Sequence, residues 1–276
     1  MNREEKIERL NNSKNYSFSD LVEIVSLLRA PGGCPWDMEQ THESIRSDFI
    51  EETYEVIEAI DNKDRDLLCE ELGDVMLQVV FHAGIETDAG TFTVNDVIDG
   101  ICKKLIHRHP HVFGDISVNN SAEVLTNWDI IKSEEKQRET VTSKLRSIPR
   151  QLPSLMRAQK VGKKAKCFDF ADADAVFDKL DEEKKELLEA ATSGDQEKIN
   201  EEAGDLLLTV TSLCRKLNVN AEEALNNATD KFINRFETVE NEVILSGKDI
   251  NSVNMEELDE IWDKNKKKIV KNTKKM

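Results

Sequence analysis

Pairs of carboxylates at helical spacing are the clearest chemical signal in this sequence. Glu52 and Glu55 lie three residues apart, and so do Glu71 and Asp74. Side chains with this spacing project from one face of a helix. If a helix hairpin brought the two faces together, four carboxylates would converge and their repulsion would raise their pKa values. A divalent cation that prefers oxygen ligands, such as Mg²⁺ or Mn²⁺, would relieve this repulsion.

The second half of the chain repeats the pattern after a shift of 131 residues. Positions 51–79 and their shifted counterparts are identical at 12 of 29 places without a gap. The second set of carboxylates consists of Glu183, Glu186, Glu202 and Asp205. A solvated acidic helix explains a single such pair, but the repeated spacing favours duplication of a site. A di-iron centre is disfavoured because neither set contains a Glu-x-x-His motif.

Basic and aromatic residues follow each acidic segment in the same order. They are Lys104, Arg108, Trp128 and Lys132 in the first half, and Lys231, Arg235, Trp262 and Lys266 in the second. Because Lys231 and Arg235 lie four residues apart, both can contact phosphate oxygens from one helical face. Trp262 could stack on a nucleobase, with Lys266 reaching phosphate from the same side. Taken alone, these residues are also explained as a surface ion pair and a core aromatic side chain.

Apolar periodicity predicts the elements that would position these groups. Apolar residues recur at steps of three and four, for example at Ile50, Tyr54 and Ile57, which is typical of amphipathic helices. Asp64 and Asp195 lie in short polar breaks and are expected to begin the second helix of each hairpin. A glycine inside each second helix costs helix stability, which suggests close approach of another backbone or a ligand. These glycines are Gly73 and Gly204.

The repeat and the composition together predict an all-α protein of two domains. The chain has 276 residues, few of them aromatic or glycine, as expected for long helices. We expect a first domain at 15–137, a linker at 138–152, a second domain at 153–266 and a basic tail at 267–276.

Charge and cysteine content exclude several classes of protein. With 55 acidic and 38 basic side chains, the net charge is −17, which disfavours binding to nucleic acid or to an anionic membrane surface. No apolar run approaches the roughly 18 residues that span a bilayer. The five cysteines include no C-x-x-C pair, so we expect a cytoplasmic protein without a zinc site. The sequence has neither a Gly-rich phosphate loop nor a G-x-S-x-G motif, so any phosphate chemistry would depend on metal ions.

In their order along the chain, these motifs resemble the two-domain MazG family of nucleoside triphosphate pyrophosphohydrolases. The resemblance rests on residues 28–37, 40–41, 108–114 and 152–160, together with both E-E-x-x-E and both E-x-G-D patterns. It extends over nearly the whole chain.

The resemblance implies a tandem repeat of four-helix-bundle-like domains, in which helices of two protomers pack together as a homodimer. It also implies Mg²⁺-dependent hydrolysis of NTPs and dNTPs to monophosphate and pyrophosphate, in clearance or regulation of the nucleotide pool, with the activity in the second repeat. Carried over residue by residue, Glu183, Glu186, Glu202 and Asp205 would hold the metal. Lys231 and Arg235 would hold the phosphates, and Trp262 with Lys266 the nucleotide.

Other polar residues would line the same pocket by this resemblance. They are Lys179 with Glu182, and Lys198 with Glu201. We expect Glu182 or Glu201 to accept a proton from the attacking water. The first repeat retains its own four carboxylates, so it is a second candidate metal site, and Lys104, Arg108, Trp128 and Lys132 are its candidate substrate contacts.

Two other functions agree with the sequence. One is a helical regulatory protein whose carboxylates bind a cation or a basic partner without catalysis. The other is a hydrolase restricted to dUTP or dCTP, which would require buried hydrogen bonds to the base. Metal-dependent nucleotide affinity would argue against the first, and equal kcat/KM values across bases would argue against the second.

Overall fold

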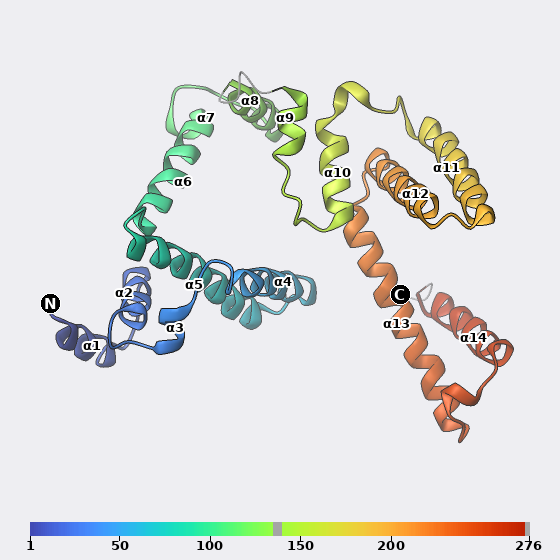
Figure 1. Cartoon of the computed structure of the whole chain (residues 1–276), viewed down its shortest axis with the longest axis horizontal. Helices are drawn as coiled ribbons and strands as arrows, with labels where there is room; N and C mark the ends of the chain where they lie inside the picture. The colour runs from blue at the N-terminus through green and yellow to red at the C-terminus, as the bar shows by residue number, and fades with distance from the viewer. Residues whose placement is uncertain (135–139, 274–276) are drawn as a thin grey trace. The chain divides into compact units, whose positions relative to one another are not determined.

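The computed structural model describes the backbone of residues 1–134 and 140–273, and leaves out the side chains of residues 129, 132–134 and 266–273. Within this part, every regular element is a helix. The chain divides into two compact units, Met1–Lys136 and Gln137–Met276 (Figure 1). The predicted all-α fold is confirmed. None of the described helices is both long and apolar enough to cross a lipid bilayer.

The first unit is built around a long helix hairpin. Its helices are α1 (Arg3–Asn11), α2 (Phe18–Arg29), α3 (Pro35–Glu39), α4 (Arg46–Asn62), α5 (Arg65–Ala89), α6 (Val94–Arg108), α7 (Pro110–Phe113) and α8 (Ser121–Glu134). Helix α4 packs along α5, helix α2 crosses α5, and α6 contacts α8. The core between α2 and α5 contains Val25, Val80 and Phe81, with Ile45 and Val94 at its edges.

The second unit repeats this arrangement. Its helices are α9 (Val141–Arg146), α10 (Ser154–Lys164), α11 (Ala173–Ser193), α12 (Gln196–Lys216), α13 (Ala221–Leu245) and α14 (Met255–Thr273), with 3₁₀ turns at Lys166–Phe168 and Ile250–Ser252. Helix α11 pairs with α12, helix α10 packs on α12, and α13 pairs with α14. In Figure 1, α14 lies along the half of α13 that is farther from α10. Helix α9 lies within the segment that we expected to be a linker.

Aspartate caps set the tight turn of each acidic hairpin. The Asp64 carboxylate accepts hydrogen bonds from the backbone N–H groups of residues 66 and 67, both at 3.1 Å. Asp195 accepts in the same way from residues 197 and 198, at 3.1 and 3.4 Å. The preceding helices end at left-handed residues, Lys63 (φ 57°) and Gly194 (φ 71°), which reverse the chain direction. The helix starts expected at Asp64 and Asp195 are therefore confirmed.

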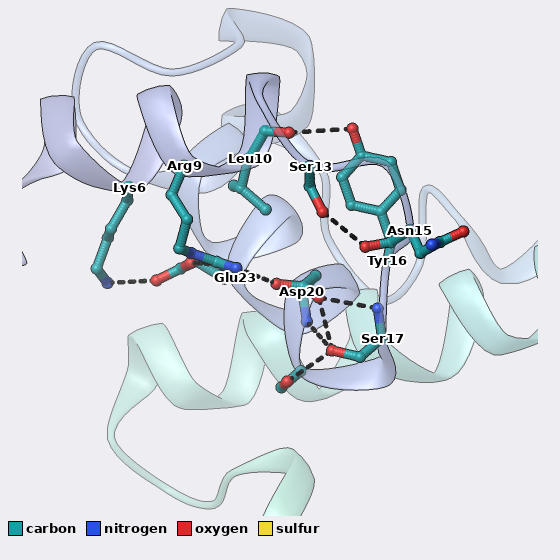
Figure 2. A network of polar contacts seen from close by, with 10 residues as sticks. Lys6, Arg9, Leu10, Ser13, Asn15, Tyr16, Ser17, Asp20 and Glu23 are labelled. Atoms are coloured by element: carbon teal, nitrogen blue, oxygen red, sulfur yellow. Dashed lines mark hydrogen bonds and ion pairs between the residues drawn. The ribbon is translucent and has the colours of Figure 1, made fainter.

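Helix α1 is fastened to α2 by an ion-pair network, shown in Figure 2. Arg9 contacts Asp20 at 2.6 Å and Glu23 at 2.5 Å, and Lys6 contacts Glu23 at 3.1 Å. Hydrogen bonds from Ser17, followed by the contact with Arg9, lower the pKa of Asp20 to about 2. Our predicted first domain begins at residue 15, whereas the structure packs α1 against α2.

The apolar stripe predicted on α4 faces away from the hairpin. Ile50, Tyr54, Ile57 and Ile60 are 44–55% exposed. The inner face of α4 instead carries Glu52, Glu55 and the fully buried Ala59. A single copy of this chain therefore leaves much of the amphipathic pattern unburied, while it directs acidic side chains inward.

The two helical glycines have open surroundings. A Cβ added to Gly73 or Gly204 would meet no atom within 4 Å, apart from the helix's own backbone. The close backbone approach that we inferred at these positions does not occur among the described residues.

Candidate active site

The acidic hairpin of the second unit brings three carboxylates together. Glu183 and Glu186 lie on α11 and Glu202 lies on α12, and one oxygen of each lies within 4.8 Å of the others. We call these residues the second carboxylate trio. Glu183 is 5% exposed, although an isolated charge is rarely buried to this extent. The fourth predicted ligand, Asp205, lies outside this close group, but its charge still contributes to raising the pKa of Glu202.

The electrostatics of the second carboxylate trio favour a cation. Burial raises the pKa of Glu202 above its ordinary value of 4.5, and the charge of Glu186 raises it further. Both effects disfavour the ionised carboxylate in a cluster made only of oxygen donors. A hard divalent ion would reverse this penalty, so these residues fit Mg²⁺ or Mn²⁺.

A lysine on the same helix partly compensates the acidic charge. The Lys179 Nζ lies 2.9 Å from Glu183 and 2.8 Å from Glu182, and these contacts raise the pKa of Lys179. Glu201 and Lys198 lie exposed on α12. The charge of Glu201 contributes to raising the pKa of the adjacent Glu202.

A cavity of about 580 Å³ adjoins the second carboxylate trio. Lys179, Glu183 and Asp205 form part of its wall. Much of the remaining wall consists of apolar side chains of α10, of α12 and of the turn before α11, together with Asp169, Arg215 and two hydroxyl side chains of α12. The volume suits a small organic ligand with one charged end.

Several residues of this cavity were not assigned from the sequence. Phe168, Asp169 and Phe170 line it from the turn before α11, and Arg215 lines it from α12. An acidic residue between two aromatic residues in an interhelical turn is a local signal for such a role. The contact between Asp169 and Arg215 has no local signal in the sequence, because 46 positions separate the two residues.

The first unit contains a matching cluster, the first carboxylate trio, formed by Glu52, Glu55 and Glu71. Burial raises the pKa of Glu52, and the charge of Asp74 raises it further. Burial likewise raises the pKa of Glu71, and the charge of Glu55 adds to this effect. The charge balance differs from that of the second unit, because Asp48 occupies the position equivalent to Lys179. This cluster therefore lacks the lysine that lies beside the second trio.

The predicted basic and aromatic residues meet where α6 contacts α8 in the first unit and where α13 pairs with α14 in the second. We call each of these helix pairs the second hairpin of its unit. The Arg235 guanidinium lies over the Trp262 ring at 5.9 Å, and Arg108 lies over Trp128 at the same distance. Phe232 also contacts Trp262, with ring centroids 5.3 Å apart. Among the described residues, no hydrogen bond, ion pair or ring contact joins Arg235 or Trp262 to the second carboxylate trio.

The other predicted substrate contacts are less constrained. Lys104 and Lys231 are exposed on α6 and α13. The side chains of Lys132 and Lys266 lie outside the described part of the chain.

A histidine pair in the first unit was also missed from the sequence. The Nδ1 atoms of His42 and His82 are 2.7 Å apart, and the rings stack with centroids at 5.0 Å. The His42 Nε2 lies 2.7 Å from a carboxylate oxygen of Glu86, which also accepts from the Thr91 hydroxyl. Burial, then the charge of His42, lowers the pKa of His82.

Comparison with known proteins places these sites in a family. The model of the MazG nucleotide pyrophosphohydrolase domain matches residues 40–113 and again residues 171–240. The nucleoside triphosphate pyrophosphohydrolase/pyrophosphatase MazG of Thermotoga maritima is 45% identical over 251 residues, which cover 90% of this chain and 95% of that protein. A nucleoside triphosphate pyrophosphohydrolase of Escherichia coli is 44% identical over 252 residues, covering 90% and 96%. The chain therefore belongs to the MazG nucleotide pyrophosphohydrolase family.

Proposed function

We propose that this protein hydrolyses nucleoside triphosphates, both NTPs and dNTPs, to nucleoside monophosphate and pyrophosphate in a Mg²⁺-dependent reaction that clears or regulates the nucleotide pool. The second repeat would carry the activity. The observation that supports this most directly is the second carboxylate trio, because its member Glu183 lies beside Lys179 on the wall of a cavity that is also lined by apolar side chains. A triphosphate needs the charged end, and a nucleoside fits the apolar end.

The carboxylates of the second repeat suit the metal that the reaction requires. Glu183, Glu186 and Glu202 would hold Mg²⁺ together with Asp205, and Mn²⁺ would be a substitute. When bound, the ion supplies charge neutralisation for the phosphates and lowers the pKa of water.

The chain's own groups then orient the phosphates and accept a proton. Lys179 can exchange its contacts with Glu182 and Glu183 for a phosphate oxygen of the substrate. Glu182 or Glu201 would take the proton of the attacking water. Among the described residues, Glu182 is held by Lys179 at 2.8 Å and Glu201 has no ion-pair partner, which favours Glu201.

Residues of the second hairpin would complete the site from another copy of the chain. Lys231 and Arg235 would bind phosphates, and Trp262 with Lys266 would contact the nucleotide. The Arg235 guanidinium lies over the Trp262 ring, and within the described part of the chain neither side chain has a hydrogen bond or ion pair with the second carboxylate trio. Exposed apolar residues on α13, such as Phe232 and Ile233, both at 56%, support a homodimer in which α13 is covered.

The product pattern tests the proposed reaction. Purified protein is incubated with each NTP and Mg²⁺, and the products are separated by ion-exchange chromatography and identified by phosphorus NMR. We expect monophosphate and pyrophosphate in equal amounts, and no turnover in excess EDTA. Formation of diphosphate with orthophosphate, or no hydrolysis of any NTP, would contradict the proposal.

A further inference from the structure

The apolar end of the cavity depends on a short segment between α10 and α11. Residues 167–170 line the cavity opposite Leu208 and Thr209 of α12. Phe168 is 94% exposed, so packing against the chain does little to fix its ring. Another interaction must therefore hold this segment against the cavity.

An ion-pair clamp provides that attachment. The two terminal nitrogens of Arg215 each donate to one carboxylate oxygen of Asp169, one of them at 2.9 Å. Lys216 contacts the same carboxylate at 3.1 Å and also donates to the carbonyl oxygen of Phe170. The paired, planar geometry fixes direction as well as distance. These contacts hold the pKa of Asp169 well below its usual range, so the clamp stays charged at neutral pH.

Helix α10 has a glycine at the point where the Arg215 side chain comes close to it. A Cβ added to Gly162 of α10 would lie 3.0 Å from the Nε of Arg215. Any larger residue at position 162 would displace the guanidinium. The Nε itself is buried without a hydrogen-bond partner, which costs stability. Because the Asp169–Arg215 pair leaves this donor unpaired, a gain in stability explains the pair poorly. A role in fixing the position of residues 167–170 explains it better.

We propose that Asp169 and Arg215 are positioning residues for the nucleoside, because they fasten the segment 167–170 that forms part of the cavity wall against which it binds. This inference rests on the proposed function. Phe168 and Phe170 present ring surface for a base, while the metal and phosphate groups bind at the end that contains Glu183. Trp262 would add stacking that any base can supply, so it contributes affinity without selectivity.

Binding of two product fragments tests this division of the cavity. Calorimetry with Mg²⁺ would compare nucleoside monophosphates with pyrophosphate in the full chain and in Asp169→Asn and Arg215→Met. We expect each variant to bind monophosphates about tenfold more weakly, at the lower end of what one base–aromatic stack contributes. Pyrophosphate affinity should be unchanged. The kcat/KM for NTPs should also fall in both variants, chiefly through a higher KM.

Further variants distinguish a positioning role from a general loss of folding or stability. Gly162→Ala keeps both charges but displaces Arg215, so it should reproduce the loss of monophosphate affinity. The double variant of residues 169 and 215 should be no worse than either single variant, because the pair acts as one unit. Lys248→Met removes an ion pair of the same unit that does not line the cavity, the more exposed Lys248–Glu257 pair at 2.6 Å, and should change neither affinity.

The outcomes distinguish this inference from the proposed function. An equal loss of pyrophosphate and monophosphate affinity, or unchanged monophosphate affinity in both single variants, would overturn the inference even if the wild-type chain hydrolyses NTPs. Absence of NTP hydrolysis with intact, clamp-dependent monophosphate binding would overturn the proposed reaction and support the nucleoside site.

Discussion

The two carboxylate trios differ most in the side chains beside them. In the second repeat, Lys179 contacts Glu183, and Lys198 lies on the facing helix. The equivalent positions in the first repeat carry Asp48 and Leu67. A triphosphate adds several negative charges, so it needs nearby cations as well as a metal. The surroundings of the first trio are therefore less suited to a triphosphate than those of the second.

This difference predicts unequal effects of matched substitutions in the two repeats. Glu186→Ala should lower kcat/KM by about 10³ or more, since a catalytic metal contributes several kcal/mol of charge stabilisation. Glu55→Ala, the equivalent change in the first repeat, should retain most of the turnover. Steady-state kinetics on both variants, with circular dichroism to verify folding, provides the measurement. The opposite ranking would assign catalysis to the first repeat.

The histidine pair predicts a local dependence of stability on pH. Because the Glu86 carboxylate only accepts, Nε2 of His42 must donate to it, and Nδ1 of neutral His42 then accepts from Nδ1–H of His82. The pKa of folded His82 lies below its ordinary value of 6.5. The unfolded chain therefore binds the proton more readily, and stability is lost as pH falls below about 6.5.

Hydrogen-exchange protection of α5 would measure this loss. Between pH 7.5 and 5.5, the free energy of local opening should decrease in the wild type and stay nearly constant in His82→Gln. His109→Gln, which changes a histidine outside the pair, should behave like the wild type. An unchanged pH slope in His82→Gln would show that another group is responsible.

At the scale of helices, the sequence predicted which segments pair but not which faces they bury. The carboxylate spacing and the caps at Asp64 and Asp195 are local, so they indicated both acidic hairpins and, in each, a set of four carboxylates of which three form the close group. The outward apolar face of α4 was not foreseen, because periodicity identifies a face without saying what covers it. The Asp169–Arg215 clamp and the His42–His82 pair join distant segments, and only the folded chain brings them together.

The acidic hairpins should respond to Mg²⁺ more strongly as pH rises. The pKa values of Glu52, Glu71 and Glu202 are raised from 4.5 by burial and neighbouring charge. In the metal-free chain, the stability they contribute is therefore present below pH 4.5 and lost as pH rises through their folded values. Bound Mg²⁺ removes this penalty, and it stabilises the fold by about 2.7 kcal/mol at a free concentration 100 times its Kd.

Thermal melting in Mg²⁺ and in EDTA at pH 5 and pH 8 would test this response. We expect a larger Mg²⁺-induced increase in Tm at pH 8, and a smaller one in Glu52→Gln/Glu202→Gln. Glu189→Gln, an exposed residue of α11, serves as the control and should keep the full increase. An increase that is equal at both pH values would argue against metal binding at the raised-pKa carboxylates.

At the scale of the molecule, each copy leaves apolar helix faces exposed. Tyr54 and Ile57 on α4, with Phe232 and Ile233 on α13, are each 44–56% exposed. Monomeric proteins seldom expose large apolar patches, so each of these helix faces is a candidate contact surface. Association of two copies would cover these faces and could also bring Arg235 of one copy to the carboxylates of the other.

Complementation between two inactive variants would test whether sites form across copies. Glu186→Ala lacks a metal ligand and Arg235→Ala lacks a phosphate contact, so each alone should be nearly inactive. If each site combines carboxylates of one copy with Arg235 of the other, a mixed dimer contains one intact site. Random exchange of subunits in an equal mixture should then restore roughly a quarter of wild-type activity.

Two controls test whether the recovered activity comes from sites formed between two copies. Sedimentation velocity should show a dimer for the wild type and a shift toward monomer for Ile57→Glu, but no shift for Val112→Glu, which changes a more exposed apolar residue on α7. The mixture should also lose its recovered activity when both partners carry Ile57→Glu, because the intact site exists only across the contact between copies. Exchange of subunits without any recovery would show instead that each active site is built from a single chain.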